Sequence, residues 1–238
     1  MAIAVFMRHG HYPQPQGVPS AHLPYRLSES GAEQAQAGAL SLAHWLSQQD
    51  TSLDPVIDSS HLPRARQTAE IVARTLAQEW GQRTEVRQYE ALAERSVGAF
   101  ANLSVSKIEQ ILVEEMGLPS PPPGWKRDPN YRLPVVGAES LLESGKRILD
   151  HVAERLSPDR SAKLFVGHGG AFRLAAALGA ALPMNEVNQL SMHYGGWVAF
   201  QASPANAGSL DLKKIGGAWK VRALSSHQPQ MTTQGALD

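Results

Sequence analysis

The stretch Ala2-Ile3-Ala4-Val5-Phe6-Met7-Arg8-His9-Gly10 decides the fold and indicates where the chemistry lies. Its apolar residues predict a short buried strand, and a cation and an imidazole follow directly at the carboxyl end of that strand. In open α/β sheets, ligands bind in the crevice outside the carboxyl ends of the strands, and a glycine there lets the backbone turn or approach a ligand. We therefore expect a functional site around Arg8, His9 and Gly10.

Two later stretches repeat this pattern of a strand, polar residues and a helix. Residues 59–69, Ser-Ser-His-Leu-Pro-Arg-Ala-Arg-Gln-Thr-Ala, follow a short apolar strand predicted at 55–59 and open a helix. Residues 164–170, Leu-Phe-Val-Gly-His-Gly-Gly, again place a histidine between a strand and a helix. Because the carboxyl ends of parallel strands meet at one edge of a sheet, the three junctions are expected to form one constellation.

The rest of the chain also alternates between strand and helix patterns. Apolar spacing predicts helices from Ser28 to about residue 46 and over 64–80, 105–116, 140–156 and 171–182, and strands at 85–89 and 163–167. Residues 197–201 and 218–224 are expected to pair as an antiparallel hairpin at a sheet edge, after a long irregular loop at 11–27. This order predicts one α/β domain over 1–224 with a mainly parallel sheet and helices on both faces, followed by a disordered tail at 225–238.

As an ordered set, these motifs resemble the histidine phosphatase superfamily, the phosphoglycerate mutase-like enzymes. The family's marks are an Arg-His-Gly after the first strand, a Ser-x-x-x-x-Arg-Ala-x-Gln-Thr stretch, an acidic residue midway and a late His-Gly. The chain has all four in that order, as Arg8-His9-Gly10, residues 59–68, Glu94 and His168-Gly169. The resemblance covers about 3–197 and implies a three-layer α/β sandwich with a helical and loop insertion, about 94–137, over the active site.

The resemblance implies a phosphatase that hydrolyses a phosphomonoester through a phosphohistidine on His9. A neutral imidazole can attack phosphorus, and planar guanidinium groups, here Arg8 and Arg64, bind phosphoryl oxygens bidentately. His168 would stabilise charge in the transition state, and the helix that begins after Gly169 can add backbone donors. Glu94 matches the family's acidic position and would protonate the leaving group, with Glu29 and Glu90 as rivals by sequence alone.

Arg64 and Arg66 cannot both face this site. Two positions along a helix turn the side chain by roughly 200°, so the two guanidinium groups point in nearly opposite directions. The family pattern places the arginine before Ala65, which selects Arg64. Arg66 is then expected to be solvated or ion-paired on the surface.

Further cations in and near the insertion are candidates for binding the part of the substrate that does not react. Arg95, Lys126 and Arg127 resemble the substrate-binding set of phosphoglycerate mutases, and a proline-bounded loop carries Trp125, Lys126 and Arg127 as an expected lid. The mutase pattern, however, has Glu-Ser after Arg-His-Gly and an asparagine six residues after the histidine, where this chain has His11-Tyr12 and Pro15. We favour a phosphatase, with mutase-type phosphoryl transfer as the alternative.

Two rivals from other classes remain open. His9-Gly10-His11 is an H-x-H at the end of a first strand, as in metal-dependent hydrolases built on eight-stranded barrels, but only about six strands are predicted here. A binding protein that has lost activity is disfavoured because all five expected catalytic residues are present. We therefore expect neither a metal nor a cofactor.

Composition limits the partners. The chain has 238 residues, 42% of them hydrophobic, with 22 basic and 22 acidic residues and no cysteine. A formal net charge of zero predicts no general attraction to nucleic acid or to acidic membranes, so the expected partner is a phosphorylated small molecule. No apolar run approaches the roughly 18 residues of a membrane span, and we expect a cytoplasmic enzyme, with a homodimer as one candidate assembly.

Overall fold

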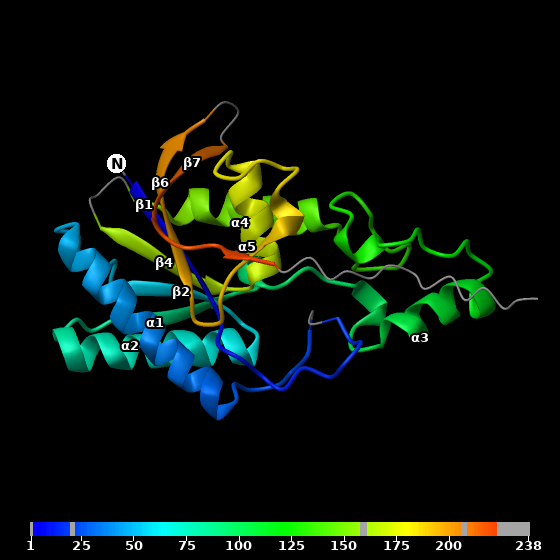
Figure 1. The fold of residues 1–238 in the computed structure, drawn as a ribbon, viewed down its shortest axis with the longest axis horizontal. Helices are drawn as coiled ribbons and strands as arrows, with labels where there is room; N and C mark the ends of the chain where they lie inside the picture. The colour runs from blue at the N-terminus through cyan, green and yellow to red at the C-terminus, as the bar shows by residue number, and fades with distance from the viewer. Residues whose placement is uncertain (1, 20–21, 158–160, 206–208, 223–238) are drawn as a thin grey trace, which may run out of the picture.

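The structure is a computed structural model that describes residues 2–19, 22–157, 161–205 and 209–222. Its centre is a six-stranded sheet in the order β3-β2-β4-β1-β6-β7 (Figure 1). Four strands are mutually parallel, namely β1 (Ala2–Arg8), β2 (Val56–Ser60), β3 (Glu85–Tyr89) and β4 (Ala162–Gly167). β6 (Trp197–Pro204) and β7 (Leu210–Gly217) complete the sheet in the antiparallel direction. The mainly parallel α/β sheet predicted from the sequence is confirmed.

Helices cover both faces of the sheet because β1 alternates its apolar side chains between two cores. Val5 and Met7 face a cluster formed with α1 (Glu29–Gln48) and α2 (Pro63–Trp80). Ala4 and Phe6 face the opposite cluster, formed with α4 (Leu141–Arg155) and α5 (Gly169–Leu178). Figure 1 shows the two helix pairs on opposite sides of β1 and β4.

The helix ends follow the capping residues in the sequence. The Ser28 side chain accepts a hydrogen bond from the Gly31 backbone N–H and caps α1. Ser140 and Glu143 form a capping box at the start of α4. Gly81, with a φ of 66°, ends α2 in the left-handed conformation that glycine adopts without strain.

The segment between β3 and α4 forms a separate lobe beyond the strand ends. It contains α3 (Val105–Gln110), a π-helical turn at Ile111–Glu115 and a 3₁₀ turn at Trp125–Arg127. Trp125, Phe100 and Ile108 belong to its own hydrophobic cluster. The loop at 11–27 lies against this lobe, because the Val105 N–H donates to the Gly17 carbonyl at 3.0 Å. Both segments extend from the same end of the sheet in Figure 1.

The predicted hairpin of residues 197–201 with 218–224 is wrong. β6 lies between β1 and β7, and its hairpin partner is the 210–217 strand. Residues 220–221 instead form β8 (Lys220–Val221), which pairs with β5 (Leu190–Ser191) in a separate two-stranded ribbon. The reason is that β7 is an edge strand with adjacent lysines and glycines, so its sequence carries only a weak strand signal.

Two other expectations concern the end of the chain and membranes. The predicted disordered tail at 225–238 lies outside the described residues. Within the described ranges, no helix combines the length and the apolar character that a bilayer crossing would require.

Candidate active site

His9 leaves β1 at the edge where the parallel strands end. Its backbone N–H donates to the Gly167 carbonyl of β4 at 3.0 Å, and its side chain is buried with 3% exposed. Nδ1 lies 2.7 Å from the Gly10 carbonyl, which can only accept, so Nδ1 carries the proton. Nε2 therefore presents its lone pair, and the Arg64 Nε–H points at it from 3.3 Å.

The His9 imidazole is held in its neutral form. Burial is the main cause that lowers its pKa well below the usual range, and the positive charges of Arg64 and Arg8 add to that effect. A neutral imidazole with a fixed tautomer and a free lone pair on Nε2 is the form of histidine that can act as a nucleophile.

Arg64 connects the two histidines. It stands in the first turn of α2, directly after Pro63, and its side chain is completely buried. Besides contacting His9, its NH2 group lies 3.3 Å from His168 Nδ1, and its NH1 group donates to the Leu23 carbonyl at 2.9 Å. One planar guanidinium thus faces both imidazoles, and the loop at 11–27 fixes its orientation.

Arg66 occupies the opposite side of α2. Its Nε lies 3.5 Å from a carboxylate oxygen of Glu70, and both side chains are substantially exposed. Arg66 was expected to be solvated or ion-paired on the surface, and it is ion-paired. Arg64 is the arginine of this stretch that turns towards the strand ends.

His168 caps α5 directly after β4 and is completely buried. Because the Arg64 guanidinium can only donate, His168 Nδ1 accepts, and the proton on Nε2 donates to the Ser60 hydroxyl at 2.9 Å. Burial first, then the positive charge of Arg64, lowers the pKa of His168 well below its usual range. The rings of His9 and His168 lie 5.1 Å apart, so both face the same small space.

Arg8 reaches the site from the last residue of β1. Its NH1 group donates to the Met192 carbonyl at 2.7 Å, and its guanidinium carbon lies 3.9 Å from the centre of the Tyr194 ring. Gly169 permits this course, because a Cβ there would lie 3.0 Å from the Arg8 Cδ. Among the residues that the structure describes, the buried Arg8 Nε has no hydrogen-bond partner and can still bind a ligand.

The backbone after His9 is locked against α1 and α2. The Gly10 N–H donates to the Thr68 hydroxyl at 3.1 Å, and a Cβ on Gly10 would lie only 2.1 Å from the Gly31 carbonyl oxygen. The glycine after β1 therefore serves a close approach between two backbones. His11 Nδ1 lies 2.8 Å from the Ser28 hydroxyl at the start of α1, and its ring contacts Tyr194 with ring centres 5.4 Å apart.

The metal-hydrolase alternative loses its structural basis. The sheet is open, with β3 and β7 at its edges, whereas that alternative requires an eight-stranded barrel. A search of the described ranges finds no group of three or more His, Asp or Glu side chains placed to hold a metal ion.

Glu94 reaches the start of α5 from the loop after β3. One of its carboxylate oxygens accepts from the backbone N–H groups of Ala171, at 3.2 Å, and Arg95, at 3.1 Å. Burial lowers the pKa values of Arg8 and Arg64, and the negative charge of Glu94 is among the influences that oppose this lowering. The rival residues Glu29 and Glu90 are exposed.

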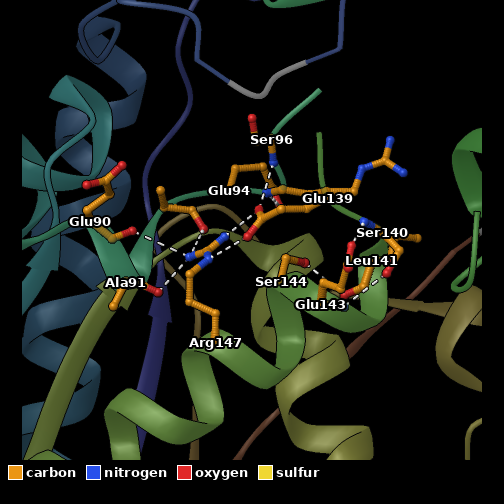
Figure 2. Close-up of polar contacts among 12 residues, drawn as sticks. Glu90, Ala91, Glu94, Ser96, Glu139, Ser140, Leu141, Glu143, Ser144 and Arg147 are labelled. Atoms are coloured by element: carbon orange, nitrogen blue, oxygen red, sulfur yellow. Dashed lines mark hydrogen bonds and ion pairs between the residues drawn. The ribbon is translucent and has the colours of Figure 1, made fainter. Parts of the chain in front are cut away.

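The loop that carries Glu94 is held by one ion pair, shown in Figure 2. Arg147 of α4 binds both carboxylate oxygens of Glu139 at 2.8 Å. Its NH1 group also donates to the carbonyls of Ala91, at 2.7 Å, and Ala93, at 3.2 Å. On the other side of Glu94, the Ser96 N–H donates to Glu139 at 3.0 Å. The same pair therefore binds the backbone before and after Glu94.

A cavity of about 230 Å³ opens beside this loop, and its lining includes Glu94, Glu139, Arg147 and His22. Burial alone would raise the pKa of Glu139, but the hydrogen bonds from Arg147 and from the Ser96 backbone lower it. The cavity thus has a charged, fixed wall and adjoins the carboxylate of Glu94.

The three cations expected to bind substrate, Arg95, Lys126 and Arg127, differ in whether they are buried or exposed. Arg95 is buried in the insertion, with its guanidinium carbon 5.8 Å from the centre of the Trp125 ring. Trp125 is itself buried and donates to Glu109, while Lys126 and Arg127 are exposed. The structure brings Arg8, His9, Arg64, Glu94 and His168 together, whereas Arg95 packs inside the lobe.

Several residues at the site were not found from the sequence. Tyr194 contacts Arg8, Ser60 bonds to His168, and Arg147 binds the backbone of the loop that carries Glu94, but none of the three was predicted as a site residue. Ser60 could have been found, because it lies inside the 59–69 stretch. Tyr194 and Arg147 carry no local signal, since tertiary packing alone brings them to the site.

Comparisons with known proteins bear on the family and the fold. A family model described as histidine phosphatase superfamily (branch 1) matches residues 4–212. A search of the curated proteins finds no match. Among solved structures, "Mycobacterial hydrolase 1" is 23% identical with a TM-score of 0.64, covering 91% of this chain and 98% of that one.

Two further solved structures have names that state an activity. A mycobacterial glucosyl-3-phosphoglycerate phosphatase is 24% identical with a TM-score of 0.62, covering 90% of this chain and 97% of that one. The alpha-ribazole phosphatase from Shigella flexneri is 23% identical with a TM-score of 0.61, and the coverage is 90% of this chain and 95% of that one. At these identities the likeness shows a shared fold.

Proposed function

The chain belongs to the histidine phosphatase superfamily (branch 1), and we propose that it hydrolyses a phosphomonoester of a small metabolite through a phosphohistidine on His9. The observation that carries this proposal is the orientation of the His9 ring, with Nδ1 bound to the Gly10 carbonyl and Nε2 facing Arg64. That arrangement leaves Nε2 as the atom that attacks phosphorus.

In the first step, the Nε2 lone pair forms a bond to phosphorus while the ester P–O bond breaks. Arg8 and Arg64 bind the phosphoryl oxygens. The Arg64 N–H groups that point at the two imidazoles in the free protein donate to those oxygens instead. Burial first, then the charge of Arg64, lowers the pKa of His168, and the arriving phosphoryl charge opposes that lowering. His168 can therefore take up a proton from solvent, donate to a phosphoryl oxygen, and return the proton when phosphate leaves. Glu94 gives its proton to the leaving alkoxide.

In the second step, water replaces the alcohol. The Glu94 carboxylate accepts a proton from water as the water oxygen bonds to phosphorus, and the P–N bond to His9 breaks. Inorganic phosphate leaves, and His9 regains its lone pair. Both steps use only side chains of this protein, and metal independence is part of the proposal.

Hydrolysis is favoured over mutase-type transfer by the residues after His9. The polar Glu-Ser pair of the mutase pattern is replaced by His11 and Tyr12, and the His11 imidazole is bonded to the Ser28 hydroxyl. The names of two structural neighbours, a glucosyl-3-phosphoglycerate phosphatase and an alpha-ribazole phosphatase, support the same choice.

The proposal is tested by trapping the enzyme with a ³²P-labelled phosphomonoester in buffers that contain a chelator. We expect an acid-labile, base-stable adduct, which is the behaviour of a phosphoramidate, together with release of inorganic phosphate. His9→Ala should abolish both, whereas the matched control His11→Ala should retain both. An acid-stable adduct, full activity of His9→Ala, or activity that depends on added metal would contradict the proposal. Phosphate transfer to an added hydroxy acid in preference to water would favour the mutase alternative.

A further inference from the structure

Beside the phosphoryl site, the short segment around β5 collects arginines from distant parts of the chain. Arg8 donates to the Met192 carbonyl at 2.7 Å, and Arg173 of α5 donates through NH1 to the Leu190 carbonyl. Residues two apart in an extended segment are separated by roughly 6–7 Å. Arg173 is therefore anchored next to a guanidinium that belongs to the phosphoryl site.

The same segment binds two more arginines through backbone atoms. The Arg222 N–H, just after β8, donates to the Gln189 carbonyl at 2.8 Å. The Asn188 side-chain amide donates to the Arg127 carbonyl at 3.1 Å and so joins the insertion to this segment. Four arginines from β1, the insertion, α5 and the C-terminal ribbon thus converge on residues 188–192.

The charges of these arginines act on one another. Burial first, then the positive charge of Arg222, lowers the pKa of Arg173 to about 10. Burial, then the charges of Arg127 and Arg8, lowers the pKa of Arg222 as well. Glu94 is the carboxylate that opposes these effects. The side of the site next to Glu94 is therefore strongly positive.

These guanidinium groups are not neutralised within the described part of the chain. None of Arg127, Arg173 and Arg222 has an ion pair with a carboxylate there. Arg173 is only 4% exposed, and its buried Nε has no hydrogen-bond partner among the same residues. A buried cation without an anionic partner is costly, and that cost falls when an anion binds nearby.

We propose that Arg222 and Arg127, supported by the buried Arg173, form a second anion-binding subsite next to the phosphoryl site. The inference rests on the proposed phosphatase function and narrows its substrate to a phosphomonoester that carries another anionic group, a carboxylate or a phosphate. Guanidinium groups bind either group bidentately. Arg222 is half-buried and Arg127 is exposed, so these two can touch the substrate, whereas Arg173 is a positioning residue that fixes the Leu190 carbonyl.

The subsite also explains why the insertion is joined to the 188–192 segment. Asn188 binds the Arg127 backbone carbonyl and the next residue, Gln189, binds the Arg222 backbone N–H, so the two arginines are attached to adjacent residues of one segment. After burial, the charge of Arg127 is the next cause that lowers the pKa of Arg222. Lys126, the adjacent cation, has no such anchor in the described ranges. The subsite therefore includes Arg127 and leaves Lys126 out.

The test compares substrates that differ in one charge. In the first arm, the anionic substrates are the meta and para isomers of carboxyphenyl phosphate, and their neutral partners are the matching carbamoylphenyl phosphates. In the second arm, the anionic substrate is a phenylene bisphosphate and its neutral partner is hydroxyphenyl phosphate. The measured quantity is the ratio of kcat/KM for the anionic substrate to that for its neutral partner. In Arg222→Gln and in Arg127→Gln we expect this ratio to fall about 10- to 100-fold, the range of one charge-assisted contact.

Lys220→Gln is the matched control, because Lys220 is an exposed cation two residues before Arg222 on the same ribbon. It removes the same charge and should leave the ratio unchanged. A ratio that is unaffected in both arginine variants, or that falls equally in Lys220→Gln, overturns the subsite. The arm in which the ratio changes identifies carboxylate or phosphate as the second group. If the wild type hydrolyses no member of either series, the proposed phosphatase function fails and the subsite fails with it. If the wild type hydrolyses anionic and neutral substrates equally well, only the subsite fails.

Discussion

Each of the two site histidines owes its tautomer to a neighbour that can hydrogen bond in only one way. The Gly10 carbonyl can only accept, so it fixes the proton of His9 on Nδ1. The Arg64 guanidinium can only donate, so it fixes the proton of His168 on Nε2, next to Ser60. The two imidazoles therefore present their acceptor nitrogens to the Arg64 guanidinium. When a phosphoryl group arrives, its oxygens can replace the two nitrogens as acceptors of the guanidinium hydrogen bonds.

At the residue scale, the role proposed for Glu94 makes a quantitative prediction. Glu94→Gln removes the proton that an alkoxide needs on departure, so kcat/KM for alkyl phosphates should fall about 10²- to 10⁴-fold. Hydrolysis of 4-nitrophenyl phosphate should fall far less, because that leaving group departs without a proton. Both rates are measured by phosphate release. The control Glu90→Gln removes an exposed carboxylate of the same loop and should change neither rate. Equal losses on both substrates in Glu94→Gln would assign Glu94 another role.

The sequence predicts residues of this site where a local rule applies and misses them where only tertiary packing decides. The helical period separates Arg64 from Arg66, and the structure places one inside and the other in a surface ion pair. No local rule singles out Tyr194, which reaches Arg8 only because the chain returns to the strand ends before β6. Arg173 does carry a local signal, because it is the one cation in an otherwise apolar helix.

At the element scale, the loop from β3 to the insertion behaves as one unit because Arg147 and Glu139 bind its backbone on both sides of Glu94 (Figure 2). We therefore expect Arg147→Gln to reproduce the leaving-group pattern of Glu94→Gln in weaker form. The double variant should be no worse than Glu94→Gln alone, because both changes remove the same function.

The measurement is kcat/KM for an alkyl and an aryl phosphate in each variant, with thermal unfolding as a check on the fold. The matched control is Lys146→Gln, which removes the adjacent cation of α4 from an exposed ion pair with Asp150 and should leave the leaving-group pattern unchanged. If Arg147→Gln slows both substrates equally, its role is structural and does not pass through Glu94.

A helix or strand could be predicted from the sequence where its burial requires a regular spacing of apolar residues. The strands β1, β2 and β4 and the helices α1, α2 and α4 are buried on at least one side, and their apolar spacing located them. β3 has no buried residue, and only a weak alternation of half-buried side chains indicated it. β7 lies at a sheet edge, most of its residues are exposed or half-buried without regular alternation, and two of them are lysines, so its pattern resembles that of a loop. The pairing of β5 with β8 joins segments about 30 residues apart, which no period in either segment can indicate.

On the scale of the whole molecule, a chain of zero formal net charge keeps a strongly positive site. In exposed ion pairs such as Lys146 with Asp150, the opposite charges balance each other on the surface, and such pairs contribute little to stability. At the strand ends, by contrast, Arg8 and Arg64 are removed from water, and burial is the leading cause that lowers the pKa of each. Folding thus concentrates unbalanced cations at one place, and the two buried histidines must remain neutral beside them.

That concentration predicts how stability depends on pH. His9 and His168 have pKa values well below the 6.5 of a free histidine, chiefly through burial and the charge of Arg64. Below about pH 6.5 the unfolded chain binds protons at both positions while the native protein does not, so the free energy of unfolding falls as the pH falls. Each histidine contributes a slope of up to about 1.4 kcal/mol per pH unit in that range.

Urea unfolding of the free enzyme between pH 7 and pH 5, approximately the range in which a free histidine titrates, measures this slope. His9→Asn should remove about half of the histidine contribution, whereas His44→Asn, which removes an exposed imidazole of α1, should leave the slope as it is. Vanadate should flatten the slope of the wild type, because a bound anion offsets Arg8 and Arg64 and lets the native histidines bind protons too. A slope that is identical in wild type and His9→Asn would mean that the His9 imidazole takes up its proton over the same pH range in the folded protein as in the unfolded chain, so that burial and the two arginines do not hold it in the neutral form that attacks phosphorus.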